Sequence, residues 1–455
     1  MRLVQKLWIG VAMLCLSFTA SAYDFEIDGI CYDVVDLVEL TCGVSGTTKS
    51  IDFSKEVVIP SHVSFLGKTL TVVSIMDNAF KKTDIVSISL PNTCTSIGIE
   101  AFRYCKKLQS INIPEGVTSI EYGVFMSCSS LTQVNIPDGV TSIGSYAFAY
   151  CSSLSHITIP EGVTTIGDDA FKQSTITSLC ISDSNQKLEF GSKAFDNSKI
   201  KDLYIGRELE WNSYDNYAIF YNADIDSLTI GNRVTKIGVE FFAGEGVGSI
   251  YSVKSVQKLN ILPSEKTLDI YSLKFDIYSL ESLNPNVLIL GRNLDGSYIF
   301  GNATNLKHLE VCGNVANISN LSLGKNDIST MLVKTATPPI CANKTFSKNT
   351  YLYCSLKVPV GTLNAYKSAE GWKNFWNIEE CDFSGVEAIE EDNAVSCVAN
   401  NGGIRIENKD ENSIVRVYNI QGSMLAETSE SVVNNLPKGL YIVTVENKSF
   451  KVSLR

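Results

Sequence analysis

The sequence contains 455 residues, and 38 Lys and Arg residues against 49 Asp and Glu residues give a formal net charge of −11. This acidic balance argues against nucleic acid or anionic lipid as the main partner, because both would be repelled. Hydrophobic residues make up 44% of the chain, enough for an ordered core, and only 3 residues are histidine. With only three histidines, the sequence argues against a histidine metal site or a Ser/His catalytic dyad. The composition therefore favours a protein that is not an enzyme.

Residues 1–22 have the pattern of a secretory signal peptide. Two basic residues precede an apolar run over residues 7–19, and small residues before position 23 predict cleavage after Ala22. A lipid attachment at Cys15 is rejected because Leu14 stands where a small residue is needed. The apolar run is shorter than the about 20 residues of a membrane-spanning helix, and no later segment approaches that length. We therefore expect an exported chain without a transmembrane segment.

A repeat with one constant period dominates the next part of the chain. Phe102, Phe125, Phe148 and Phe171 follow one another at the same interval, and prolines and isoleucines keep the same step. In the unit Leu131–Ser153, apolar residues at the first, fourth and sixth positions alternate as in a short strand with one buried side. This arithmetic is typical of one turn of a leucine-rich solenoid. A single turn cannot bury its apolar face alone, so stacked neighbours must supply the core.

Further phenylalanines carry the pattern beyond the regular stretch at less even spacing: Phe80, Phe195, Phe220, Phe242, Phe300 and Phe346. After Phe300 the regular apolar spacing returns between Leu306 and Ile318. Together these anchors predict a mainly β solenoid of about ten turns over residues 72–335. Longer or degenerate turns are expected around residues 181–215 and 246–300.

The units resemble the BspA-like (Treponema pallidum type) leucine-rich repeats of secreted bacterial surface proteins, whose signature is Ile-Pro-x-Gly-Val-x-x-Ile-Gly-x-x-Ala-Phe-x-x-Cys. The matching positions in one unit are Ile136, Pro137, Gly139, Val140, Ile143, Gly144, Ala147, Phe148 and Cys151. The resemblance covers residues 23 to about 380. It implies an N-terminal β-hairpin cap over residues 23–71, beginning with Asp24–Val35. It also implies a C-terminal cap over residues 336–382, in which Tyr366, Trp372 and Trp376 seal the last turn.

A second domain is expected after an acidic linker at residues 383–393, which shows no periodicity. Residues 394–455 alternate in short strands separated by turn residues, which predicts a small immunoglobulin-like β-sandwich. This part resembles the C-terminal sorting domain of the type nine (Por) secretion route of Bacteroidetes. The matching positions are Val415, Val417, Tyr418, Asn419, Gly422, Leu436, Gly439, Tyr441, Val443 and Lys451. The alternative is an immunoglobulin-like terminal domain with another role.

The 13 cysteines raise the question of disulfides in an exported chain. Three of them recur at one position of the repeat: Cys105, Cys128 and Cys151. Because Ser174 takes this position in the next turn, we expect small buried groups with free thiols there. A hairpin centred on Asp36–Leu37 would place Cys31 opposite Cys42, which makes them a candidate disulfide. No CxxC pair occurs, so zinc-ribbon and thioredoxin sites have no support.

Motifs of catalysis are missing from the sequence, which contains no GxSxG, HExxH, P-loop or Rossmann glycine pattern. Paired carboxylates at Asp168–Asp169 and at Glu208 with Glu210 could serve a glycosidase. Such pairs are more often solvated turn residues. We therefore expect no catalytic site and neither a metal nor an organic cofactor.

Outward side chains of the strands are expected to form two polar ladders on the concave face of the solenoid. The first contains Ser110, Gln133, His156, Ser178, Asp202, Ser227 and His308, and the second Asn112, Asn135, Thr158, Cys180, Tyr204, Thr229 and Glu310. Mostly neutral hydrogen-bonding groups suit an extended polypeptide or glycan. The candidate ligand-binding residues are Gln133, Asn135, His156, Thr158, Asp202, Tyr204, Ser227 and Thr229.

Two classes of function fit these features. The resemblance to adhesins implies an exported cell-surface or secreted binding module that engages host matrix protein, mucin, or a microbial surface protein or glycan. The alternative is an envelope scaffold that binds another bacterial component, retained in the periplasm where the sorting machinery is absent. A surface carbohydrate-active hydrolase is a distant third. A soluble β-surface without any ligand is the plain structural alternative.

Overall fold

The computed structural model describes residues 23–48, 51–211, 218–238, 240–243, 253–271, 283–295, 299–301, 303–383, 396–400, 403–407, 414–419, 424–434, 436, 439–445 and 448–454. The expected signal peptide and its cleavage after Ala22 lie outside the described residues, as does the expected linker apart from residue 383. The chain divides into two compact units, Met1–Cys381 and Asp382–Arg455, and each is described by itself.

A mixed sheet covers the N-terminal end of the first unit. Its strand order is β1 (Phe25–Ile27), β2 (Ile30–Asp36), β3 (Thr41–Thr47), β6 (Lys68–Ile75) and β5 (His62–Phe65). The Phe25 ring stacks on Tyr32 and Phe65, with ring centroids 5.2 and 4.3 Å apart. Strand β6 also pairs in parallel with β8 (Ser96–Ile97), so the cap and the first repeat share one sheet.

The hairpin of β2 and β3 contains Cys31 and Cys42 but does not bring them together. Cys31 lies opposite Gly46, and Cys42 lies opposite Val34. Both thiols are buried and free, so the candidate disulfide is not formed. The turn is centred two residues later than the sequence suggested, and the strand pairing contains two register shifts of the kind that a β-bulge produces.

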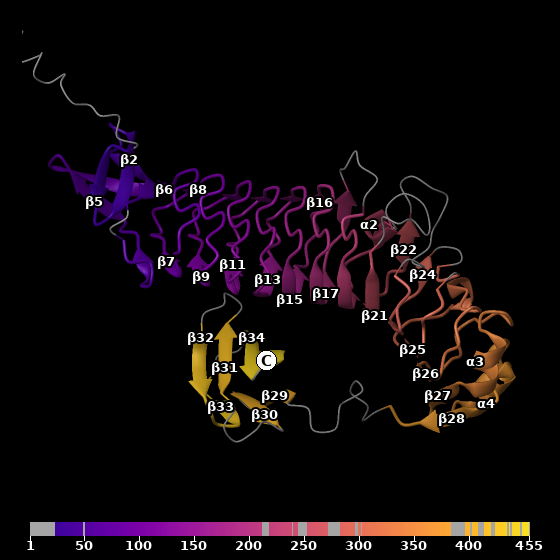
Figure 1. Cartoon of the computed structure of the whole chain (residues 1–455). Coiled ribbons are helices and arrows are strands. Elements are labelled where there is room, and N and C mark those ends of the chain that lie inside the picture. The colour runs from indigo at the N-terminus through magenta and orange to yellow at the C-terminus, as the bar shows by residue number, and fades with distance from the viewer. Residues whose placement is uncertain are drawn as a thin grey trace, which may run out of the picture. The chain divides into compact units, whose positions relative to one another are not determined.

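A sheet of 14 parallel strands forms one side of the solenoid. The first, β4, is Val57–Val58. In sheet order it is followed by β7 (Ser87–Ser89), β9 (Ser110–Asn112), β11 (Gln133–Asn135), β13 (Leu154–Ile159), β15 (Thr175–Ile181), β17 (Lys199–Ile205), β19 (Asp224–Ile230), β21 (Ser255–Ile261), β23 (Val287–Leu290), β25 (His308–Val311), β26 (Thr330–Val333), β27 (Ser355–Pro359) and β28 (Ile378–Cys381). The strands follow one another as a continuous row (Figure 1). Eleven of them lie within residues 72–335, where about ten turns were predicted.

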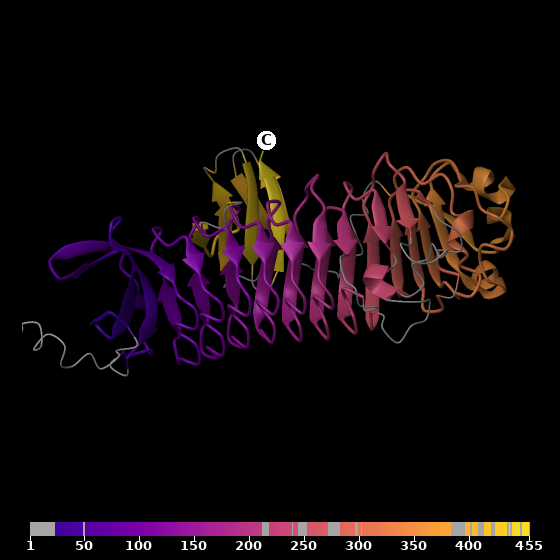
Figure 2. The same cartoon turned by 90° about the horizontal axis from the view of Figure 1, so that it is seen from above.

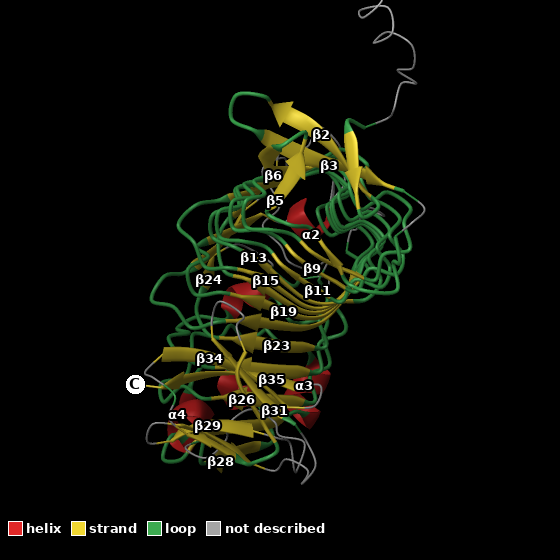
Figure 3. Ribbon diagram, turned by 90° about the vertical axis from the view of Figure 1, so that its left-hand side faces the viewer, coloured by secondary structure: helices red, strands yellow, loops and turns green. Residues whose placement is uncertain are grey.

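The turns from β9 to β23 each contribute a second, shorter strand to a separate layer, which lies above the main sheet in Figure 1. Seen from above, successive turns lie side by side (Figure 2). One parallel sheet contains β10 (Ser119–Ile120), β12 (Ser142–Ile143), β14 (Thr165–Ile166), β16 (Leu188–Phe190) and β18 (Leu209–Trp211), and another contains β20 (Lys236–Gly238), β22 (Leu268–Tyr271) and β24 (Leu294–Asp295). Loops join the two layers at their ends, and the few helices include α2 (Glu240–Ala243) (Figure 3). The apolar core lies between the layers, as the alternation predicted.

The repeated phenylalanines stack on one another inside this core. Rings from successive turns lie nearly parallel, with centroids 5.2 Å apart for Phe148 and Phe171 and 5.0 Å for Phe171 and Phe195. The stack runs without a break through Phe80, Phe102, Phe125, Phe148, Phe171, Phe195, Phe220 and Phe242. Each of these rings is at most 1% exposed. The prediction of a buried aromatic wedge in each turn is confirmed for these residues.

In successive turns, the small residue three positions after the phenylalanine is a hydrogen-bond donor. The Cys128 thiol donates to the Phe102 carbonyl at 3.1 Å, and the Cys151 thiol donates to the Phe125 carbonyl at 3.2 Å. In the next turn the Ser174 hydroxyl donates to the Phe148 carbonyl at 2.7 Å. The thiols are buried and free, as expected. Serine can replace cysteine at this position because both are small donors that reach back one turn.

The C-terminal cap follows the last repeat and contains α3 (Lys348–Tyr353), α4 (Leu363–Ser368) and the 3₁₀ turn η2 (Trp372–Asn374). Tyr366 and Trp372 are fully buried, and they donate hydrogen bonds to the carbonyls of Thr335 and Pro339, both at 2.7 Å. These two aromatics seal the last turn as predicted. Trp376 does not, because its side chain is 80% exposed. Phe375, only 5% exposed, fills the core in its place.

The second unit has its own small core. One antiparallel sheet contains β29 (Ser396–Asn400), β30 (Gly403–Glu407) and β33 (Val432–Asn434), and the other contains β32 (Met424–Thr428), β31 (Val415–Asn419), β34 (Gly439–Val445) and β35 (Lys448–Leu454). Buried residues of both sheets form one cluster that includes Ile404, Val417 and Val443. This arrangement agrees with the small β-sandwich expected from the sequence. Among the described residues of the chain, no helix is long and apolar enough to cross a membrane.

Candidate binding surface on the concave sheet face

The main sheet lines the inner side of the curve of the first unit, and its strand register brings the predicted ladder residues together (Figure 1). In the first ladder, successive partners are Ser110, Gln133, His156, Ser178, Asp202 and Ser227. In the second, Asn112 pairs with Asn135, and Thr158, Cys180, Tyr204 and Thr229 follow one another. Neighbouring positions are therefore about 4.8 Å apart, one strand spacing.

Exposure divides the eight candidate residues into two groups. Gln133, Asn135, His156, Thr158 and Asp202 are exposed. The remaining three, which come from β17 and β19, are half-buried: Tyr204, Ser227 and Thr229. Polar groups on the earlier strands are thus the more accessible ones for a ligand.

Tyr204 is held in place by its surroundings. Its hydroxyl donates a hydrogen bond of 2.6 Å to Oδ1 of Asp183, and burial and this bond raise the pKa of Tyr204 well above its usual range. A Cβ atom added at Gly231 would lie 2.6 Å from the Tyr204 hydroxyl oxygen, so the glycine leaves room for the ring. Partial burial of its carboxyl group also raises the pKa of Asp202, although the residue as a whole is exposed. A ligand would meet a fixed aromatic surface at Tyr204.

The register also identifies ladder positions that sequence reasoning missed. Lys258 lies beside Ser227 in the first ladder, and Asn260 lies beside Thr229 in the second. The signal was present, because β21 repeats the alternation of β19 residue by residue. Beyond them the ladders pass through Val287 and Ile289 to the predicted positions His308 and Glu310. Glu310 forms an ion pair of 2.7 Å with Lys334, so that end of the second ladder already has a partner.

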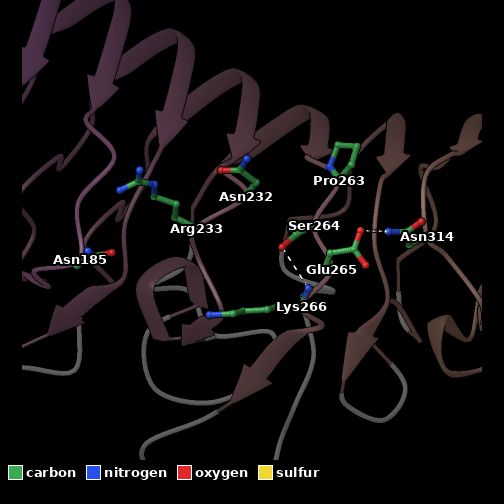
Figure 4. Close-up of a pocket in the computed structure, with 8 residues that line it drawn as sticks. All are labelled: Asn185, Asn232, Arg233, Pro263, Ser264, Glu265, Lys266 and Asn314. Atoms are coloured by element: carbon green, nitrogen blue, oxygen red, sulfur yellow. Dashed lines mark hydrogen bonds between the residues drawn. The ribbon is translucent and has the colours of Figure 1, made fainter.

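A notch opens where the strands of the main sheet end. Two loops, residues 182–187 and 262–267, are each twice as long as the corresponding loop of the turn that follows. A cavity of about 560 Å³ lies between them (Figure 4). Its lining residues are Asn185, Asn232, Arg233, Pro263, Ser264, Glu265, Lys266 and Asn314. Glu265 accepts a hydrogen bond of 2.8 Å from the Asn314 amide. Because Gly231, which precedes the lining residue Asn232, lies against Tyr204, the notch adjoins the second ladder.

Two buried arginines support this edge. Arg207 donates hydrogen bonds to the carbonyls of Pro160, Glu161 and Val163 at 2.6 to 2.9 Å. Arg292 donates to the carbonyls of Gly231 and Asn232 at 2.8 and 3.3 Å. Each arginine thus reaches two turns back, past the turn that carries the long loop. Burial lowers the pKa of Arg292 to about 10 and also lowers that of Arg207.

The carboxylate pairs considered for catalysis serve the turns. The Asp168 carboxylate accepts a hydrogen bond of 2.6 Å from the Ser192 backbone N–H. The Asp169 carboxylate accepts a hydrogen bond of 3.0 Å from the Lys172 ammonium group. Glu208 accepts a hydrogen bond from the Thr235 hydroxyl, and Glu210 pairs with Lys187. Within the described part of the chain, no group of three or more His, Cys, Asp or Glu side chains is arranged to hold a metal ion. The surface is suited to hydrogen bonding with an extended partner.

A stack of short parallel strands that recur with the period of the phenylalanines defines a protein of the leucine-rich repeat class. The family model of the BspA type leucine rich repeat region matches with 6 copies over residues 73–201, 184–262 and 216–357. These matches span well over half of the 455 residues, and the chain belongs to this family. The resemblance inferred from the repeats is confirmed. The likeness of residues 394–455 to a sorting domain stays a prediction.

Several solved structures are similar to this chain. A leucine-rich repeat protein from Bacteroides ovatus is 22% identical, with 79% of this chain and 100% of that chain covered and a TM-score of 0.35. The Treponema pallidum leucine-rich repeat protein is 24% identical, with 41% and 86% covered and a TM-score of 0.34. The pneumococcal vaccine antigen PcpA is 16% identical, with 79% and 98% covered and a TM-score of 0.35. Comparison with curated proteins gave no match.

Proposed function

We propose that the chain is an exported, non-catalytic adhesion module of the bacterial surface that binds an extended protein or glycan with its concave sheet face. The observation that carries this proposal is the pair of polar ladders, which project in one direction from adjacent strands between Ser110 and Thr229. Host matrix protein, mucin, and microbial surface protein or glycan are the partners that such a surface fits. The notch beside Tyr204 extends the surface by Arg233 and Lys266.

Energetics explain why the partner should be extended. A neutral hydrogen bond contributes only about 0.5–1.5 kcal/mol net, so no single ladder residue can supply much affinity. Five or six successive turns with two outward groups each can do so together. Tyr204 differs from the other positions because a fixed aromatic supplies a larger share of an interface. Repetition of one strand spacing also selects a ligand whose own groups recur along a line.

The concave face is tested with a combined change of Gln133, Asn135, His156, Thr158 and Tyr204 to Ala. Binding to immobilised mucin and matrix protein should fall by more than about tenfold, which corresponds to about 1.4 kcal/mol. The matched control changes five exposed residues beside the other layer to Ala: Thr118, Glu121, Tyr122, Thr141 and Thr164. Both variants are first checked for an unchanged unfolding midpoint. Full binding by the ladder variant, or an equal loss in the control, would remove the concave face from the proposal.

Export is the second part of the proposal. The pattern of residues 1–22 and the resemblance of residues 394–455 to a sorting domain support it. The separate core of the second unit indicates that this unit can be deleted without unfolding the solenoid. Deletion of residues 394–455 should therefore leave the solenoid's unfolding transition in place and abolish its accessibility to protease on intact cells. Unchanged accessibility would make the sorting assignment wrong, and protection of the full chain would favour the periplasmic scaffold.

A further inference from the structure

An exposed tryptophan marks a second surface at the C-terminal end of the solenoid. Trp376 is 80% exposed, although its backbone N–H donates a hydrogen bond of 3.0 Å to the Tyr351 carbonyl. In the same cap, the Tyr351 and Phe375 rings pack edge to face, with centroids 5.0 Å apart. The cap is already sealed by Trp372, so the core does not require this indole. A large flat ring is thus presented to solvent from a cap whose own core is packed.

A pocket of about 700 Å³ lies beside this ring. Its lining includes Tyr351 and Trp376 together with the side-chain amides of Asn343 and Asn374. The charged residues that line it are three exposed lysines: Lys344, Lys348 and Lys373. No carboxylate lines the pocket, although the whole chain carries a net charge of −11.

The nearby acids do not neutralise these lysines. Asp327 accepts hydrogen bonds of 2.9 and 3.1 Å from the Ser347 hydroxyl and the Asn349 amide. Glu370 accepts one of 3.1 Å from the Asn343 amide. Among the described residues, no ion pair engages the three ammonium groups of the pocket. They remain available to an anionic ligand, which they attract most strongly at low salt.

We propose that this pocket binds an acidic saccharide, with one sugar ring against Trp376 and its carboxylate or sulfate group among the three lysines. An indole face matches the apolar C–H face of a pyranose ring, while the amides match its hydroxyl groups. An acidic peptide would satisfy the lysines but would not need the exposed ring. The site lies in the C-terminal cap, outside the two ladders, so it gives the chain a second point of attachment. Two sites on one chain strengthen attachment to a surface that carries both ligands.

The test measures binding of the purified full chain to four probes. Heparin carries sulfate and carboxylate groups, hyaluronan carries carboxylate alone, dextran is a neutral saccharide and poly-glutamate is an acidic peptide. We expect binding to heparin or hyaluronan that weakens as salt rises, and none to dextran. Binding to heparin but not hyaluronan assigns the lysines to sulfate, and binding to both assigns them to acid groups in general. No binding to either acidic saccharide, or equal binding to dextran, overturns the proposal.

Variants separate the ring from the charges. Trp376→Ala should weaken saccharide binding by about tenfold or more, and Trp376→Phe should restore part of it, since an aromatic anchor contributes a large share of binding. A triple variant should weaken binding further and reduce its salt dependence. It combines Lys344→Gln, Lys348→Gln and Lys373→Gln. The control for the ring is Tyr353→Ala, another exposed aromatic of the cap that does not line the pocket. The control for the charges is the same triple change at exposed lysines elsewhere: Lys68, Lys106 and Lys367.

The substituted side chains are exposed, so the unfolding midpoint of each variant should match that of the unchanged chain. Equal losses in variants and controls, or full binding by Trp376→Ala, would overturn the proposal, as would poly-glutamate binding that matches saccharide binding. The ladder variant should bind heparin or hyaluronan normally. That result distinguishes a failure of this pocket from a failure of the concave face.

Discussion

Two stretches of one solenoid are stabilised in different ways. Between residues 80 and 180 each turn repeats the contacts of its neighbour, with stacked rings and a thiol or hydroxyl that donates to the preceding phenylalanine carbonyl. Between residues 181 and 295 two turns have longer loops, and Arg207 and Arg292 bridge them by reaching carbonyls two turns back. The regular stretch therefore depends on nearest neighbours, whereas the irregular stretch also depends on contacts that skip a turn.

The difference shows how a solenoid can carry a notch without losing its core. A longer loop leaves backbone carbonyls of the preceding turn without the close neighbour that a regular turn provides. A long guanidinium with several donors fills that space and satisfies the carbonyls at once. The loop is then free to take polar residues such as those around the notch. The regular turns pack most closely, whereas a longer loop that is supported by a buried arginine leaves room for a ligand.

The largest effect is expected where the regular stack is interrupted. Phe148→Ala should lower the free energy of unfolding by about 3–5 kcal/mol, because it leaves a cavity between the rings of Phe125 and Phe171. Urea unfolding of the first unit measures this loss of unfolding free energy. An unchanged midpoint would contradict the assignment of this ring to the core. Phe148→Leu is the matched control and should cost less, since much of the volume remains.

The next effect concerns the irregular stretch. Arg207→Met keeps an unbranched side chain in the core but leaves the carbonyls of Glu161 and Val163 without this donor. The Pro160 carbonyl keeps its bond of 3.2 Å from the Val163 N–H. We expect destabilisation by about 1–3 kcal/mol, the cost of buried unsatisfied groups. Arg292→Met should act in the same way on the Asn232 carbonyl, while the Gly231 carbonyl keeps its bond of 3.2 Å from the Val234 N–H.

The arginine prediction has a control in Arg207→Lys, which keeps the charge but cannot supply the planar fork of donors. It should be about as destabilising as Arg207→Met. Hydrogen exchange should show the loss in the backbone amides around residues 182–187, not in the regular turns. Stability equal to the unchanged chain in both variants would mean that the long loops need no support. The proposed difference in stabilisation between the regular and the irregular stretch would then be wrong.

The regular stretch was predictable from the sequence because one contact pattern recurs with the period of the chain. A constant interval between repeats fixes which side chains become neighbours, so the pairs Ser110 with Gln133 and Gln133 with His156 followed directly. The wedge phenylalanines followed for the same reason. Lys258 and Asn260 were missed only because the surrounding spacing was irregular.

Other features could not be predicted because their determinants are not periodic. Arg207 looks like a surface residue in the sequence, and only the stacked coordinates show carbonyls two turns away. The predicted pairing of Cys31 with Cys42 assumed a turn centre that lies two residues away in the structure, where the strand pairing contains two register shifts. Trp376 and Trp372 differ in burial because only one of two nearby tryptophans fits the end of the core. Spacing defines neighbours within a repeat, whereas caps depend on three-dimensional fit.

A smaller effect is expected at the donor position of the repeat. Cys128→Val removes the donor to the Phe102 carbonyl, while that carbonyl keeps its bond of 3.0 Å from the Cys105 N–H. We expect a loss of about 0.5–1.5 kcal/mol, one net hydrogen bond. Cys128→Ser should cost less, since Ser174 occupies this position naturally one repeat beyond Cys151. A valine variant as stable as the serine variant would show that only volume matters there. Unfolding midpoints of the two proteins decide the matter.

The smallest effect concerns pH, in the turn where the regular spacing returns. Burial lowers the pKa of His308 below its ordinary value of 6.5, with Glu310 opposing the shift and Lys258 and Lys334 adding to it. Nδ1 of His308 lies 2.5 Å from the Thr330 hydroxyl oxygen, and Nε2 is buried without a partner among the described residues, so the ring is held neutral.

The sign of the pH effect follows from linkage. The unfolded chain takes up a proton on this histidine at a higher pH than the folded chain, so stability falls as the pH drops below 6.5 and stops falling below the folded pKa. His308→Gln should remove this part of the acid sensitivity, whereas His156→Gln, at an exposed ladder position, is the matched control. Urea midpoints at about pH 7.5 and 5.5 measure the difference, since carboxylates titrate mostly below that range. A midpoint drop of the same size in His308→Gln as in the unchanged chain would place the acid sensitivity elsewhere.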